Sequence, residues 1–272
     1  GAGAGAGAGV STSVAGEPSE APQIVLLDVA ECTAAQMLQS VGGDLRRYDA
    51  LLLGVKVVWI SHHHADHMTG LPMLLEQIER ARMRRSARAA SLGQVPSVAK
   101  GPGMFVGGYE ADKVMIIASE AVLRYAEFAA CVAGLDGLAT FTPIVHTLYA
   151  GMTAHISAAT GGLLTRLRSV PVLHCHSSYG LVLDFAACKV VYSGDCRPSQ
   201  SLARAGLDCD LLIHEATFTD ARQADALKKR HSTTSEARRV AAQMRARHVV
   251  LTHFSQRYPL EVAEGDGQGG TG

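Results

Sequence analysis

The stretch Ser61-His-His-His-Ala-Asp-His67 decides how the rest of the chain is interpreted. It follows a short apolar run, residues 55–60, which predicts a buried strand. Side chains two residues apart on an extended segment share one face, so His62 and His64 can reach the same metal ion. Asp66 and His67 then turn toward a second position. Imidazole nitrogens and carboxylate oxygens together suit zinc better than magnesium or calcium.

Three later residues of the same chemical types stand at the ends of other predicted strands. His174, Asp195 and His253 each follow an apolar run, and strand ends let a rigid sheet aim several side chains at one point. A carboxylate such as Asp195 can bridge two ions. The sequence therefore predicts two Zn²⁺ ions, with the following ligand set: His62, His64, Asp66, His67, His174, Asp195 and His253.

The other histidines near this pattern need a different interpretation. His63 lies between two predicted ligands, so we expect its side chain to point away and to serve a structural purpose. His146, His155 and His248 have no comparable surroundings and are predicted to have no role in the site. An accidental histidine cluster is the alternative, and the three further ligands at independent strand ends weigh against it.

The order of elements predicts one α/β domain over residues 23–260. Residues 1–22 and 261–272 are low in complexity and predict a disordered lead-in and tail, and residues 91–112 predict a flexible Gly/Pro-rich insertion. Helical spacing or strand-like apolar runs mark the remaining segments. The predicted helices are residues 33–48, 71–88, 120–133 and 235–247, and the predicted strands are residues 23–28, 55–60, 114–118, 164–173, 180–185, 188–192, 211–213 and 248–252.

Composition limits the classes of protein that the chain can belong to. Of its 272 residues 47% are hydrophobic and 18% charged, which supports a packed core, and the zero net charge argues against an extended basic surface. The six cysteines form no CxxC pair, which predicts a reduced intracellular chain in the nucleus, the mitochondrion or the cytoplasm. No apolar run is long enough to predict a membrane span.

At the histidine-rich segment the chain resembles the metallo-β-lactamase superfamily, whose signature is HxHxDH. Further segments resemble the tRNase Z family, and the likeness is closest to the carboxy-terminal catalytic half of its long eukaryotic form. They are Ser61–Leu71, His174-Cys-His-Ser-Ser-Tyr-Gly180, Tyr192-Ser-Gly-Asp195, His214-Glu-Ala-Thr217, His231-Ser-Thr-Thr234 and His253-Phe-Ser-Gln-Arg-Tyr258. The resemblance implies a four-layer αβ/βα sandwich with a dinuclear zinc site at one edge.

The resemblance also implies an activity and its catalytic residues. The chain would remove the 3′ trailer from precursor tRNA by hydrolysing a phosphodiester bond. Asp66 would bind metal and orient the attacking water, while His231, positioned by Glu215, would protonate the leaving 3′ oxygen. A purely structural His231–Glu215 pair is the alternative, and Ser232 and Thr233 could equally be helix caps.

Two departures from the family pattern lead to further expectations. The family's first motif reads roughly LDCGEGT, whereas Leu27-Asp-Val-Ala-Glu-Cys-Thr33 lacks both glycines, so Val29 and Ala30 are expected to strain or reshape that loop. The tRNA-gripping arm of the short form would fall between His174 and Asp195, which are only 195 − 174 = 21 positions apart. We therefore expect an amino-terminal half or a second subunit to carry the arm.

Two other functions fit parts of the sequence. One is a different hydrolase on the same fold, a small phosphodiesterase or a lactonase, which the HEAT and HFSQRY segments disfavour. The other is a catalytically weakened RNA-binding or scaffold subunit, which the altered first motif favours and the complete ligand set disfavours. The basic runs around Arg80–Arg88 and Lys228–Arg230 are either solvated faces or contacts to RNA phosphates.

Overall fold

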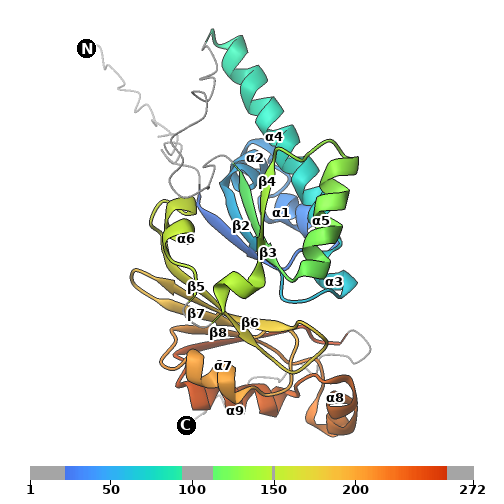
Figure 1. Ribbon diagram of the computed structural model, residues 1–272, viewed down its shortest axis with the longest axis vertical. Helices are drawn as coiled ribbons and strands as arrows, with labels where there is room; N and C mark the ends of the chain where they lie inside the picture. The colour runs from blue at the N-terminus through green and yellow to red at the C-terminus, as the bar shows by residue number, and fades with distance from the viewer. Residues whose placement is uncertain (1–21, 94–112, 149–150, 256–272) are drawn as a thin grey trace, which may run out of the picture.

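The computed structural model describes residues 22–93, 113–148 and 151–255. The predicted lead-in, nearly all of the predicted insertion and the predicted tail therefore lie outside the described residues. The described chain folds into two sheets that pack face to face, with helices on the outer side of each (Figure 1). This is the four-layer αβ/βα arrangement expected from the sequence.

The first sheet contains four parallel strands in the order β1-β2-β3-β4. They are β1 (Ile24–Leu27), β2 (Val55–Trp59), β3 (Val114–Ala118) and β4 (Ala139–Pro143). Alternation along β2 decides which layer each side chain joins. Val58 packs toward the outer helices, whereas Val57 and Trp59 pack between the two sheets. The sequence suggested a buried first strand, but β1 is an edge strand and its side chains are only half-buried.

The second sheet has five strands in the order β5-β6-β7-β8-β9. They are β5 (Leu164–Pro171), β6 (Tyr179–Phe185), β7 (Lys189–Tyr192), β8 (Leu211–Glu215) and β9 (His248–Thr252). The predicted tight hairpin of β6 and β7 is confirmed as antiparallel, whereas β7, β8 and β9 run parallel. The parallel strands therefore bring their carboxyl ends to the same edge, which faces the first sheet's histidine-rich segment.

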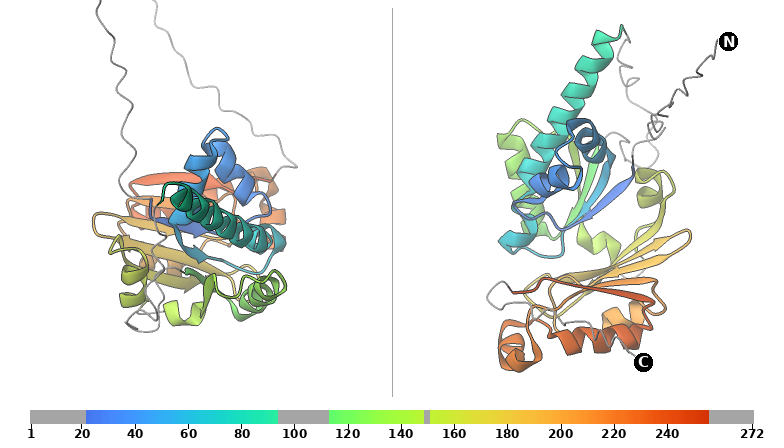
Figure 2. Two further views of the ribbon diagram at one scale, coloured as in Figure 1. Left: turned by 90° about the horizontal axis from the view of Figure 1, so that it is seen from above. Right: turned by 180° about the vertical axis from the view of Figure 1, so that it is seen from behind.

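Helices cover both outer faces, as Figure 2 shows from behind. The helices on the first sheet are α1 (Thr33–Ser40), α2 (Leu45–Gly54), α3 (Ala65–Met68), α4 (Leu71–Ser91) and α5 (Glu120–Val132). Those that follow are η1 (Ile144–Thr147), α6 (Ala154–Ala159), α7 (Gln200–Ala205), η2 (Asp220–Arg222), α8 (Gln223–Lys229) and α9 (Thr234–Met244). Within the described residues, no helix has both the length and the apolar character of a membrane-spanning segment.

One predicted helix is wrong in its extent. Residues 33–48 were expected to form a single helix, but α1 ends at Ser40 and α2 begins at Leu45. Gly42 and Gly43 adopt positive φ angles of 67° and 78°, which break the helix. The Asp44 carboxylate then caps α2 by accepting hydrogen bonds from the backbone N–H groups of Arg46 and Arg47.

Candidate metal centre

The predicted ligands gather around one carboxylate, that of Asp195, although they come from both sheets. Oδ2 of Asp195 lies 3.3 Å from Nε2 of His67, 3.4 Å from Nε2 of His253 and 3.8 Å from Nε2 of His62. The same oxygen is 3.9 Å from Nε2 of His174. Asp195 therefore occupies the central position that the sequence predicted for a bridging ligand.

The remaining residues divide into two groups on either side of Asp195. In one group, Nε2 of His174 lies 3.2 Å from Nδ1 of His64, and His62 completes the set. In the other group, Oδ2 of Asp66 lies 3.6 Å from Nε2 of His67 and 3.5 Å from Nε2 of His253. These are the two groups predicted from the sequence, and the fold brings together every residue of the predicted ligand set.

The local fold explains how one short segment supplies four of these side chains. β2 ends at Trp59, the chain continues extended through His64, and α3 begins at Ala65. His62 and His64 therefore share a face, while the turn into α3 redirects Asp66 and His67. His63 is exposed, as expected for the residue between two ligands.

Hydrogen bonds at the far ring nitrogen orient most of the imidazoles. Nδ1 of His67 donates to Asp28, 2.8 Å away, and Nδ1 of His174 donates to the carbonyl of Arg230, 3.0 Å away. Nδ1 of His253 donates to Oγ1 of Thr217, since that hydroxyl donates in turn to Glu215. These bonds leave Nε2 of each ring without its hydrogen, the tautomer that binds a metal ion.

The buried nitrogens at the centre fit a cation. Among the described residues, Nε2 of His62 and Nε2 of His67 are buried and make no hydrogen bond of good geometry. Two orphaned imidazole nitrogens beside a buried carboxylate would be costly without a partner of opposite character. A divalent ion would satisfy the lone pairs and the negative charge together, so the donor set fits zinc.

The electrostatics of the cluster follow from burial and from these contacts. Burial and then the nearby His67 lower the pKa of His62 to about 2, so this imidazole is neutral. Burial alone would lower the pKa of His67, but its contacts with Asp195 and Asp28 raise it to about 10. Burial would raise the pKa of Asp195, yet His67 and His253 hold it well below its usual range. The two carboxylates thus favour positive charge at this point, which is what a metal cation would bring.

Beside the ligands, His231 and Glu215 form the predicted pair. Nδ1 of His231 lies 2.9 Å from Oε1 of Glu215 and 3.9 Å from Oδ2 of Asp195. Burial alone would lower the pKa of His231, but the hydrogen bond with Glu215 raises it above its ordinary value. Thr233, the suggested helix cap, does cap α9 in a capping box with Glu236, so the cap and the His231–Glu215 pair coexist.

Sequence reasoning missed several residues that hold the site together. Asp28 accepts hydrogen bonds from the backbone and hydroxyl of Ser61 and from the hydroxyl of Tyr192, in addition to His67. Arg230 donates from Nη1 to the carbonyl of His174, 3.0 Å away. The position of Asp28 at the end of the first strand was the available signal, since it matches the position of the other site residues.

The altered first motif is accommodated differently from the expectation. Among the described residues of this loop, the positive φ angle falls on Asp28 (61°), and Val29 and Ala30 do not have one. Val29 is buried in the core, and its backbone pairs with His67 and Gly70. Gly70 supplies the close approach, because a Cβ there would lie 2.0 Å from the carbonyl oxygen of Ala30. The expectation that Val29 and Ala30 strain the loop is therefore wrong.

The basic runs are partly used inside the fold. Arg84 forms a bidentate pair with the buried Asp49, which ties α4 to α2, and Arg80 pairs with Glu76 on its own helix. Arg85 and Arg88 are exposed on the part of α4 that projects beyond the sheet (Figure 1). Contact between these two arginines and RNA phosphates stays a prediction.

Residues 40–254 match the family model described as "Beta-lactamase superfamily domain". The chain therefore belongs to the β-lactamase superfamily, with the metallo-β-lactamase fold. Within this superfamily it is similar to proteins named for tRNA processing. It is 34% identical over 237 residues to human "Zinc phosphodiesterase ELAC protein 2", a match that covers 86% of this chain and 26% of the relative. It is 32% identical over 269 residues to Arabidopsis thaliana "tRNase Z TRZ3, mitochondrial", covering 86% and 29%.

Solved structures show the same fold at lower sequence identity. A long-form RNase Z from yeast superimposes with a TM-score of 0.68 at 22% identity, covering 86% of this chain and 32% of that one. The human short-form tRNase Z gives a TM-score of 0.59 at 22% identity, covering 87% and 83%. The chain thus spans under a third of the length of the curated relatives described above.

Proposed function

We propose that this chain is the catalytic part of a zinc-dependent endoribonuclease that removes the 3′ trailer from precursor tRNA. One observation carries the proposal: a complete set of zinc-type donors surrounds Asp195, with the His231–Glu215 pair beside it. The relatives named zinc phosphodiesterase and tRNase Z support the same chemistry.

The donor groups indicate which residues would hold each ion. His62, His64 and His174 would hold one zinc ion, Asp66, His67 and His253 a second, and Asp195 would contact both. Bound there, the two ions would lower the pKa of a water molecule and neutralise charge on the phosphate.

The chain's own residues would supply positioning and proton transfer. The Asp66 side chain is 65% exposed, so its carboxylate faces both the ligands and the solvent from which the attacking water comes. Glu215 engages Nδ1 of His231, so Nε2 is the ring nitrogen left to pass a proton to the leaving 3′ oxygen. Arg197 fixes this imidazole further by donating to the backbone carbonyl of His231 and to Glu236.

The proposal includes a partner that grips the tRNA. Between His174 and Asp195 the chain forms only the β6–β7 hairpin, and the whole sequence has no net charge. Affinity for a large polyanion depends mainly on Lys and Arg contacts to phosphates. We infer that an amino-terminal half or a second subunit supplies this surface. The Arabidopsis relative named as mitochondrial supports the mitochondrion among the predicted compartments.

Two substrates separate the catalytic site from the grip. The chain alone should hydrolyse bis(p-nitrophenyl) phosphate and cleave precursor tRNA weakly. Adding the arm-bearing half should improve tRNA cleavage far more than hydrolysis of the small ester. No hydrolysis of either substrate by zinc-loaded protein would contradict the proposed chemistry, and tight, salt-resistant tRNA binding by this chain alone would contradict the proposed partner.

A further inference from the structure

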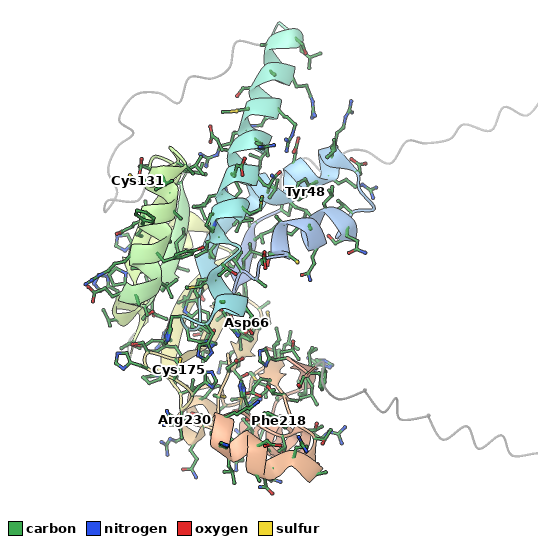
Figure 3. The ribbon with its side chains drawn as sticks, turned by 90° about the vertical axis from the view of Figure 1, so that its right-hand side faces the viewer. Tyr48, Asp66, Cys131, Cys175, Phe218 and Arg230 are labelled. Atoms are coloured by element: carbon green, nitrogen blue, oxygen red, sulfur yellow. The ribbon has the colours of Figure 1, made fainter. Side chains whose placement is uncertain are left out.

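A thiol lies among the imidazoles of the first donor group. Sγ of Cys175 and one nitrogen each of His62, His64 and His174 all lie within 4.8 Å of one another. Figure 3 shows Cys175 and Asp66 near the junction between the upper and lower halves of the molecule, with Arg230 below them. None of the ligand roles proposed above uses this thiol.

A second observation points to a cation at the same place. The His62 side chain is 0% exposed, and its Nε2 makes no hydrogen bond with any residue in the described ranges. That nitrogen belongs to the same group as the Cys175 sulfur. A fully buried imidazole nitrogen without a partner is satisfied by a metal ion among these donors.

A tight turn holds the thiol beside the group. The backbone N–H of Cys175 donates to Oγ of Ser178, and that hydroxyl donates to the carbonyl of Cys175. Sγ of Cys175 is 3.0 Å from the same hydroxyl and 3.8 Å from Nδ1 of His63. Since Ser178 is buried, the turn is anchored and the sulfur stays near the imidazoles.

We propose that Cys175 is a fourth ligand for the ion held by His62, His64 and His174, which makes this a His₃Cys site; this inference rests on the metal centre in the proposed function. In tetrahedral zinc sites two nitrogens lie about 3.4 Å apart, and a nitrogen and a sulfur about 3.6 Å apart. The observed 3.2 Å between the His174 and His64 nitrogens matches this spacing. On binding, the S–H bond breaks, the proton leaves to solvent, and a sulfur–metal bond forms.

The fourth ligand changes which ions the site prefers and how it behaves. A thiolate favours soft ions, so the His₃Cys group selects Zn²⁺ and Cd²⁺ over Mg²⁺ and Mn²⁺. Four protein ligands also close the coordination sphere, whereas a catalytic zinc site keeps an open position. Cys175 therefore competes with water or substrate for the ion and stabilises a closed, inactive form.

Cobalt substitution tests the proposal without an activity assay. The metal-free full chain is titrated with Co²⁺, and the thiolate-to-cobalt charge-transfer band in the near ultraviolet is recorded alongside the visible bands of the bound ion. Cys175→Ser keeps a side chain of similar size, and far-ultraviolet circular dichroism checks its fold. Cys188→Ser is the matched control, because Cys188 is exposed in the hairpin turn between β6 and β7.

We expect the charge-transfer band in the unmodified protein and in Cys188→Ser, and its complete loss in Cys175→Ser with the visible bands retained. Bound Co²⁺ without a thiolate band, or a band that survives in Cys175→Ser, would overturn the His₃Cys site while leaving the proposed metal centre intact. Failure to bind Co²⁺ at all would overturn both.

Alkylation of the unmodified protein gives an independent answer if Cys175→Ser does not fold. Iodoacetamide labelling followed by peptide mass spectrometry should show that Zn²⁺ protects Cys175 and does not protect Cys188. Equal labelling of Cys175 with and without bound Zn²⁺ would overturn the proposal.

Discussion

Two carboxylates, Asp28 and Glu215, support the metal centre from opposite sheets, and they do so differently. Asp28 follows β1, is 10% exposed, and accepts hydrogen bonds from Ser61, His67 and Tyr192. Glu215 ends β8, is 1% exposed, and accepts hydrogen bonds from four other segments or turns of the second sheet's half. Its donors are the backbone N–H groups of Cys196, Thr217 and Ser232, the hydroxyl of Thr217 and the ring of His231.

The difference shows how the two halves of the site are built. The Asp28 side fixes ligands that one continuous segment already places together. The Glu215 side gathers groups that are far apart in the sequence, and it positions the proton donor as well as the ligand His253, through Thr217. We therefore expect changes on the Asp28 side to weaken metal binding and changes on the Glu215 side to affect proton transfer.

The largest expected effect comes from His231→Ala on the Glu215 side. Loss of a general acid should lower kcat for RNA cleavage by about 10²-fold, with zinc content nearly unchanged. The p-nitrophenolate leaving group needs little protonation, so hydrolysis of bis(p-nitrophenyl) phosphate should fall much less. Single-turnover cleavage of both substrates measures the two effects.

His248→Ala is the matched control, because His248 is exposed at the start of β9. It should leave both rates unchanged. If His231→Ala lowers the two rates equally, His231 does not act as the acid and its pair with Glu215 is structural.

On the other side, Asp28→Asn should weaken zinc binding by about 10–100-fold, as loss of a carboxylate behind a ligating histidine does. The amide cannot hold Nδ1 of His67 and the hydroxyls of Ser61 and Tyr192 with the same charge. Competition with a chromophoric chelator measures the affinity.

Asp44→Asn is its control, since Asp44 is an exposed cap and asparagine caps helices equally well. Unchanged zinc affinity in Asp28→Asn would show that the ligands of the histidine-rich segment position themselves.

A smaller effect is expected from Glu236, which braces Arg197 behind His231. Burial alone would raise the pKa of Glu236, but its bonds from Arg197 and from the Thr233 backbone lower it below its ordinary value of 4.5. Its stabilising contribution is therefore complete above pH 4.5 and disappears as the pH falls through the lowered pKa. Glu236→Gln should lose about 1.5–3 kcal/mol of unfolding free energy at pH 7.

Urea denaturation at several pH values tests this prediction, and the difference from the unmodified protein should shrink in acid. Glu120→Gln removes an exposed pair with Arg124 and should lose less than about 1 kcal/mol at any pH. A loss from Glu236→Gln that does not depend on pH would show that packing, and not charge, is responsible.

The same comparison explains what could be predicted from the sequence. His62, His64, Asp66 and His67 could be predicted because the strand–turn–helix geometry is local and fixes their faces by spacing alone. His174, Asp195 and His253 required the assumption that separate strands end at one edge. The tautomers, the use of Thr217 between Glu215 and His253, and the Arg230–His174 contacts depend on tertiary packing, which no spacing encodes.

The errors have similar physical causes. Residues 33–48 kept a helical pattern of apolar residues, but Gly42 and Gly43 favour a turn more strongly than that pattern favours one helix. The glycines missing from the first motif seemed to require strain at Val29 and Ala30. The fold instead places the positive φ angle on Asp28 and the close approach at Gly70, which is distant in the sequence.

The central claim is that both sheets supply ligands to two zinc ions joined by Asp195. The most direct measurement is crystallography of the zinc-loaded chain, with diffraction data collected on both sides of the zinc absorption edge. The account predicts two anomalous peaks next to the Asp195 carboxylate, one beside His62, His64 and His174 and the other beside Asp66, His67 and His253. No peak, or a single peak that leaves one of these groups without an ion, would contradict it.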